Sequence, residues 1–224
     1  MPDRPLARHD LVHVTPQGWR AMLDAVEPER LGAAPYGLVE DWAERGWPVI
    51  VRRPSEHGEA STIAVGLPLP PSHGKLRLGF TIAPDCVAER LARVQPSEVV
   101  SNVPASLHAQ LDAVIALGVR LSVTPAVFGA VLWQHLTGLT YLRPGSDIDL
   151  LWPLPYGNVV PELLAALAIL DEAGPARLDG EIILADGAGV NWRELHSELG
   201  RTGGEVLVKS LSGAEFRCAR HLFA

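Results

Sequence analysis

The stretch Arg143-Pro144-Gly145-Ser146-Asp147-Ile148-Asp149-Leu150-Leu151-Trp152 decides the fold. A Pro-Gly turn leads into a β-type run in which two aspartates alternate with apolar residues. Since residues i and i+2 of a strand point to the same face, Asp147 and Asp149 project together, with Cα atoms about 6.5–7 Å apart. Two neighbouring carboxylates repel unless a cation lies between them, and oxygen ligands suit Mg²⁺, which assists phosphoryl and nucleotidyl transfer. The stretch therefore predicts a metal-binding strand; the alternative is a strand end with two solvated acids.

Composition indicates a globular protein. The 224 residues suffice for one large domain or two small ones, and 47% of them are hydrophobic. The net charge of −7 argues against a general nucleic-acid binder. No apolar run is long enough for a membrane span, and the polar start lacks the apolar segment of a secretory signal. Cys86 and Cys218 are expected to be free thiols, and the expected location is cytoplasmic.

The hydrophobic pattern predicts an α+β protein with two domains. Residues 1–83 form a small α+β domain that ends in a half-buried strand from Lys75 to Ile82. A helix from Asp85 to Val94 is expected as a linker. Residues 95–224 form the second domain, in which helices alternate with the strands of a mixed sheet. A strand ending at Phe128, a helix from Gly129 and the Asp147–Asp149 strand follow one another, and a later strand covers Arg177 to Leu184.

Gly129 ends the predicted strand and opens a helix. The first turn of a helix offers free backbone N–H groups and the positive end of the dipole, both of which favour a phosphate. Gly129 would let that phosphate approach the backbone closely. The alternative is an ordinary strand-to-helix turn that needs glycine for a positive φ.

The order of strand, glycine, helix and Ser-Asp-Ile-Asp strand resembles the nucleotidyltransferase superfamily, which has a polymerase-β-like core. Ala130 stands where the superfamily has serine; this removes one phosphate hydrogen bond but leaves the backbone amides. The superfamily usually adds a third carboxylate from a later strand. Here the candidates are Asp179, which is preferred, and Glu181, which share a face by alternation.

Several motifs narrow the resemblance to one family, the malonate decarboxylase holo-[acyl-carrier-protein] synthases, also called phosphoribosyl-dephospho-CoA transferases. They cover nearly the whole chain, in the family's order: Arg8-His9-Asp10-Leu11-Val12, Pro48-Val49-Ile50-Val51-Arg52-Arg53, Gly66-Leu67-Pro68-Leu69-Pro70, Gly74-Lys75-Leu76-Arg77, Trp133-Gln134-His135-Leu136-Thr137-Gly138-Leu139, Asp179-Gly180-Glu181 and Val190-Asn191-Trp192-Arg193-Glu194.

The resemblance implies an activity, with residues 1–83 as the domain that binds substrate or carrier and residues 95–224 as the nucleotidyltransferase catalytic domain. The family transfers 2′-(5″-triphosphoribosyl)-3′-dephospho-CoA to a serine of the apo acyl-carrier subunit of malonate decarboxylase and releases pyrophosphate. Asp147 and Asp149 would bind Mg²⁺, with Asp179 or Glu181 as a third acid. The anionic donor would need basic residues, although each of them could instead be an ordinary solvated cation. The candidates for binding the donor or its phosphates are Gly129, Ala130, Ser146, Arg143, Arg52, Arg53, Lys75, Arg77, Arg193 and Lys209.

Two alternatives remain open. The same fold could serve a related acceptor, such as the citrate lyase carrier, or another nucleotidyltransferase substrate. The chain could also be a non-catalytic nucleotide-binding protein, which the alanine at position 130 favours and the retained acids disfavour.

Overall fold

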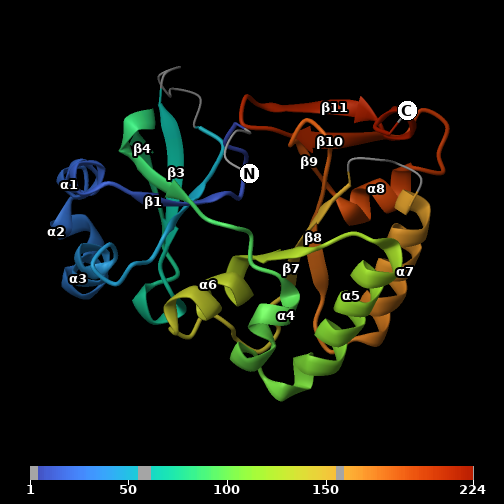
Figure 1. Cartoon of the computed structure of the whole chain (residues 1–224), viewed down its shortest axis with the longest axis horizontal. Coiled ribbons are helices and arrows are strands. Elements are labelled where there is room, and N and C mark those ends of the chain that lie inside the picture. The colour runs from blue at the N-terminus through green and yellow to red at the C-terminus, as the bar shows by residue number, and fades with distance from the viewer. Residues whose placement is uncertain (1–4, 55–61, 155–158, 224) are drawn as a thin grey trace. The chain divides into compact units, whose positions relative to one another are not determined.

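The computed structural model describes residues 5–54, 62–154 and 159–223, and the chain divides into two compact units, Met1–Arg93 and Val94–Ala224. Both contain helices and a sheet (Figure 1), which confirms the predicted α+β class. No helix in the described ranges is long and apolar enough to cross a membrane.

The first unit is built on a five-stranded antiparallel sheet of order β4-β3-β2-β1-β5. Its strands are β1 (Leu11–Val14), β2 (Val49–Val51), β3 (Ile63–Pro68), β4 (Arg77–Ile82) and β5 (Val87–Arg90). Its helices are α1 (Pro16–Asp24), α2 (Pro28–Leu31) and α3 (Ala33–Asp41). Thr15 caps α1 by accepting a hydrogen bond from the Gly18 N–H, with Pro16 at the first helical position, as the sequence predicts.

The helix predicted from Asp85 to Val94 is wrong. A short 3₁₀ turn leads there into β5, which pairs with β1. Asp10, which is only 2% exposed, holds the end of β5 and the residues after it. Its carboxylate lies 3.9 Å from Arg90 Nη1 and 3.5 Å from Arg93 Nη2. The first unit therefore extends to Arg93, beyond the expected boundary at residue 83.

The second unit contains a six-stranded mixed sheet of order β11-β10-β9-β8-β7-β6, as predicted for a mixed sheet flanked by helices. Its strands are β6 (Ala126–Phe128), β7 (Ile148–Pro153), β8 (Leu178–Ile183), β9 (Gly189–Asn191), β10 (Glu205–Lys209) and β11 (Ala214–Cys218). Its helices are α4 (Pro96–Val99), α5 (His108–Leu121), α6 (Gly129–Thr137), α7 (Val160–Ala173) and α8 (Trp192–Glu198). β7 and β8 run parallel, connected through α7, and the other neighbouring strands are antiparallel.

The central strands of this sheet are buried. Ile148, Leu150 and Trp152 of β7 are at most 1% exposed, and they point away from Asp149 by the alternation of the strand. On the Asp149 face, Leu151 packs with Ala126 and Ile183. The acids thus lie at one end of a packed sheet, which fixes the backbone beneath them.

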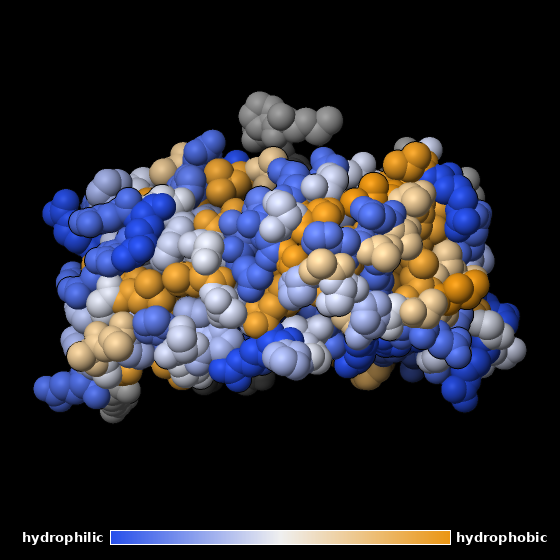
Figure 2. All heavy atoms as spheres, turned by 90° about the horizontal axis from the view of Figure 1, so that it is seen from below, coloured by the Kyte–Doolittle hydropathy of each residue, from blue (hydrophilic) through white to orange (hydrophobic). Residues whose placement is uncertain are grey.

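The helices of this unit leave some apolar surface exposed. Val119 on α5 and Ile169 on α7 are 76% and 66% exposed. Figure 2 shows apolar side chains on the helical side of the second unit, at the right of the view.

Candidate active site

The pairing of β7 with β8 brings acidic residues together. Asp149 is the register partner of Asp179 on β8 and of Phe128 on β6. Neighbouring strands are about 4.8 Å apart, so the two aspartates are adjacent on one face of the sheet. Asp147 lies one residue before β7 and two before Asp149. The site therefore consists of three acids at the end of the sheet where β7 and β8 begin.

Gly129 lies directly against Asp149. Its φ is +63°, and a Cβ added there would overlap Asp149 Oδ2 and lie 2.7 Å from Asp149 Cγ. Gly129 is also the first residue of α6, and Ala130 is the second. The glycine is thus needed for the turn and for space beside the carboxylate, and it places a helix N-terminus at the acids.

Asp179 is held by hydrogen bonds. Its Oδ1 accepts from the Gly180 N–H at 2.8 Å and from Asn191 Nδ2 at 3.0 Å. Asn191 also caps α8, because its Oδ1 accepts from the Arg193 and Glu194 N–H groups at 2.9 and 3.3 Å. These contacts orient Asp179 through Oδ1, and its second oxygen, Oδ2, takes part in neither of them.

Glu181 occupies a different position. It is the register partner of Leu151 on β7 and Asn191 on β9, further along β8, and it is 7% exposed. Asp179, whose side chain is 27% exposed, is the acid beside Asp149. Of the two candidates for the third acid, the geometry favours Asp179.

Arg177 is a site residue that the sequence analysis did not single out. Its Nη1 lies 3.7 Å from Asp147 Oδ2 and its Nη2 lies 3.9 Å from Asp179 Oδ2, so the guanidinium bridges two of the three acids. The signal was present in the sequence, since Arg177 is two residues before Asp179 and shares its face if the strand geometry continues.

The donor set suits a hard cation. The ligands available are carboxylate oxygens, which is the chemistry that Mg²⁺ prefers. Within the described residues, no three His, Cys, Asp or Glu side chains are gathered closely enough to hold one metal ion. Instead a guanidinium stands in as the cation between Asp147 and Asp179. The acids therefore fit a metal by chemistry, with Arg177 in part of the space.

The other predicted residues of the second unit are distributed differently. Ser146 closes the turn before β7, where its Oγ accepts from the N–H of the exposed Arg143 at 2.9 Å. Arg193 donates from Nη2 to Asp171 Oδ1 at 2.5 Å and to Leu178 O at 2.9 Å, and so ties α8 to α7 and β8. Lys209 is the register partner of Gly189 on β9, which in turn pairs with Ile183 at the end of β8 opposite Asp179. Ser146 and Arg143 thus adjoin the acids, and Lys209 does not.

The predicted basic residues of the first unit lie on and around β3 and β4. Arg52 donates from Nε to Val65 O at 3.1 Å, and its guanidinium lies against Gly79, where an added Cβ would come within 2.7 Å of Nη2. Arg77 is exposed at the start of β4, and Arg53 is exposed after β2. The expected strand from Lys75 begins only at Arg77; Lys75 itself is in a turn with φ +55°, so it is not paired with Arg77 on a strand face.

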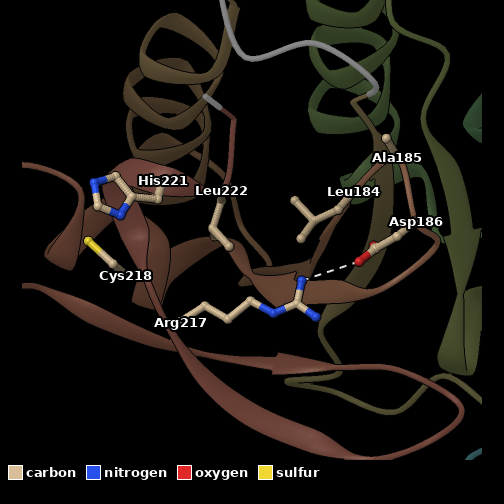
Figure 3. A pocket seen from close by; sticks show the side chains of 7 residues that line it. All are labelled: Leu184, Ala185, Asp186, Arg217, Cys218, His221 and Leu222. Carbon is tan, nitrogen blue, oxygen red and sulfur yellow. Dashed lines mark hydrogen bonds and ion pairs between the residues drawn. The ribbon is translucent and has the colours of Figure 1, made fainter.

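A surface pocket of about 490 Å³ lies elsewhere in the second unit (Figure 3). It begins at Leu184, beyond the end of β8 that is opposite Asp179. Its cation, Arg217, is paired with Asp186 at 3.2 Å and with Glu215 at 2.6 Å. Because two carboxylates already neutralise this arginine, the pocket is a poor match for an anionic donor.

Comparisons with known proteins cover both units. Residues 7–93 match the family model of the phosphoribosyl-dephospho-CoA transferase MdcG N-terminal domain, and residues 90–219 match the model of its C-terminal domain. A phosphoribosyl-dephospho-CoA transferase of Bradyrhizobium diazoefficiens is 42% identical over 209 residues, which cover 93% of this chain and 88% of that protein. One of Xanthomonas euvesicatoria is 32% identical over 204 residues, covering 91% and 90%.

No solved structure is significantly similar to the chain. The two family models and the curated relatives nevertheless agree with each other and with the resemblance found in the sequence motifs. The chain belongs to the phosphoribosyl-dephospho-CoA transferase family and is a transferase.

Proposed function

We propose that this protein transfers the 2′-(5″-triphosphoribosyl)-3′-dephospho-CoA prosthetic group to a serine of the acyl-carrier subunit of malonate decarboxylase. The serine oxygen attacks the phosphorus nearest the ribose, the bond to the next phosphate breaks, and pyrophosphate leaves. The single observation that carries this proposal is the alignment of Asp149 with Asp179 beside Gly129. It combines paired carboxylates with a helix N-terminus, the two features that phosphate chemistry requires.

We assign Asp147, Asp149 and Asp179 as the residues that hold Mg²⁺. The bound metal would neutralise the triphosphate and stabilise the leaving pyrophosphate. Gly129 and Ala130 would present backbone N–H groups to a phosphate, and one carboxylate would accept the serine proton. Glu181 is nearly buried and lies beside Leu151, so we place it behind the metal ligands.

Basic residues would hold the rest of the donor. Arg143 is exposed in the turn just before the acids and is the strongest candidate in the second unit. Arg193 is already engaged with Asp171, and Lys209 is distant along the sheet, so both are weaker candidates. In the first unit, Arg52, Arg53, Lys75 and Arg77 are the candidates, and Arg52 is already oriented by its hydrogen bond to Val65.

The test is mass spectrometry of the purified apo carrier subunit after incubation with enzyme, Mg²⁺ and donor. The expected result is a mass gain equal to the phosphoribosyl-dephospho-CoA group, together with released pyrophosphate. Asp147→Ala and Asp149→Ala should abolish the gain while the far-ultraviolet circular dichroism stays that of the wild type. Full activity in either variant would refute the assigned roles.

The acceptor is tested separately, by offering the citrate lyase carrier in a parallel reaction. Modification of the malonate decarboxylase carrier alone supports the proposal. Preferential modification of the citrate lyase carrier would show that this carrier is the acceptor, while the proposed transfer reaction would stand. Donor binding without pyrophosphate release would identify a binding protein instead.

A further inference from the structure

Arg177 supplies a positive charge at the acidic site. Its two terminal nitrogens reach Asp147 Oδ2 and Asp179 Oδ2 at 3.7 and 3.9 Å, and Asp179 is the register partner of Asp149. Both distances exceed those of a tight charge-assisted hydrogen bond, about 2.7–2.9 Å. The side chain is 56% exposed, so it can leave without unpacking the core.

A metal ion and this guanidinium compete for the same oxygens. Three carboxylates carry three negative charges, and one arginine neutralises part of that charge. A metal at Asp179 would need Oδ2, the oxygen that faces Arg177, because Asp179 Oδ1 already accepts hydrogen bonds from Gly180 and Asn191. Occupation by one cation therefore weakens binding of the other.

We propose that Arg177 occupies part of the metal site until the donor arrives, so that metal binding requires its displacement. This inference rests on the proposed function of the acids. A donor triphosphate carries negative charge that attracts the displaced guanidinium away from the carboxylates, and the metal enters with the donor. Arg177 is thus a positioning residue that makes metal loading depend on the donor.

The test measures Mn²⁺ binding to the full chain without donor, by the electron paramagnetic resonance signal of the free ion. Arg177→Gln removes the competitor and should bind Mn²⁺ about 1.5- to fivefold more tightly, the range expected for a partly exposed charge contact. Arg177→Lys keeps one charge but cannot bridge two acids. Its affinity for Mn²⁺ should fall between that of the wild type and that of Arg177→Gln.

The matched control is Arg120→Gln. Arg120 is similarly exposed, at 60%, and forms a 3.5 Å contact with Glu162 in the first turn of α7, which follows the end of β7 opposite the acids. Its loss should leave Mn²⁺ affinity unchanged. Thermal unfolding of each variant, with and without Mn²⁺, shows that the protein is folded; Arg177→Gln should gain more stability from the ion than the wild type does.

The outcomes separate this inference from the proposed function. If Asp147→Asn abolishes Mn²⁺ binding while Arg177→Gln leaves the affinity equal or weaker, the metal site stands and the role of Arg177 is overturned. If Asp147→Asn binds Mn²⁺ as the wild type does, the acids are not the metal site, and both ideas fail.

Discussion

Replacing Gly129 with alanine perturbs the site at a single carbon atom. The new Cβ would overlap Asp149 Oδ2 and lie 2.7 Å from its Cγ and 3.2 Å from its Cβ, so the carboxylate must move by roughly an ångström. A misplacement of about 1 Å at a reacting group can reduce a rate about 100-fold. Alanine at φ +63° also loses about 1–2 kcal/mol of stability, since that region is unfavourable for residues with a Cβ.

Gly138 supplies the control, because it lies at the other end of the same helix. Its φ is +70°, and an added Cβ would have nothing within 4 Å. Gly138→Ala should therefore lose similar stability in urea unfolding but keep the rate of carrier modification. Gly129→Ala should lose both stability and the rate of carrier modification. Equal rates in the two variants would show that the space beside Asp149 is not needed for the reaction.

Two further predictions concern residues around Asp179. Asn191→Ser keeps a good cap for α8 but removes the amide that donates to Asp179 Oδ1. The unfolding free energy should change by no more than about 1 kcal/mol while the transfer rate falls at least about tenfold, and an unchanged rate would contradict the positioning role of Asn191. Burial raises the pKa of Asp171, but the hydrogen bonds from Arg193 and the Leu178 N–H outweigh it and hold the pKa below its usual value. The stability from this contact is complete above the unfolded pKa of about 3.9 and is lost as pH falls toward the lower folded pKa, so Asp171→Asn should flatten the loss of stability between about pH 5 and 3 in urea titrations.

Local patterns were sufficient for much of the fold. The alternation along the Asp-Ile-Asp stretch is seen in Ile148 and Leu150, which are buried on the face opposite Asp149, because a strand repeats every two residues. Leu151, on the Asp149 face, is buried as well. Pro16 and Asn191 lie at helix starts, where their residue types are favoured, since a cap is a contact between near neighbours in the chain.

The errors arose where distant pairing overrides local preference. Residues 85–94 contain alanine, glutamate, arginine and leucine, all good helix formers, yet hydrogen bonds to β1 make part of this segment a strand. β9 and β11 were not predicted, because short strands take their conformation from their neighbours.

The site was predictable in residue type more than in arrangement. Sequence spacing places Asp147 beside Asp149, but only the register between β7 and β8 decides that Asp179 rather than Glu181 is the neighbour of Asp149. The contact of Arg177 with Asp147 is likewise defined across strands, whereas its position two residues before Asp179 could be read from the sequence. The roles of these residues in metal and donor binding stay predictions.

The pairing of β5 with β1 sets a rule for dividing the protein. Cutting after residue 83 would remove β5, bare the hydrogen-bonding edge of β1 and leave Asp10 buried without Arg90 or Arg93. An uncovered strand edge is a template for aggregation, and a buried acid stripped of its cations is costly. Fragments or chimaeras that exchange the first half between relatives should therefore be joined after Arg93. The five-stranded sheet is then complete, and Arg90 and Arg93 stay in the same fragment as Asp10.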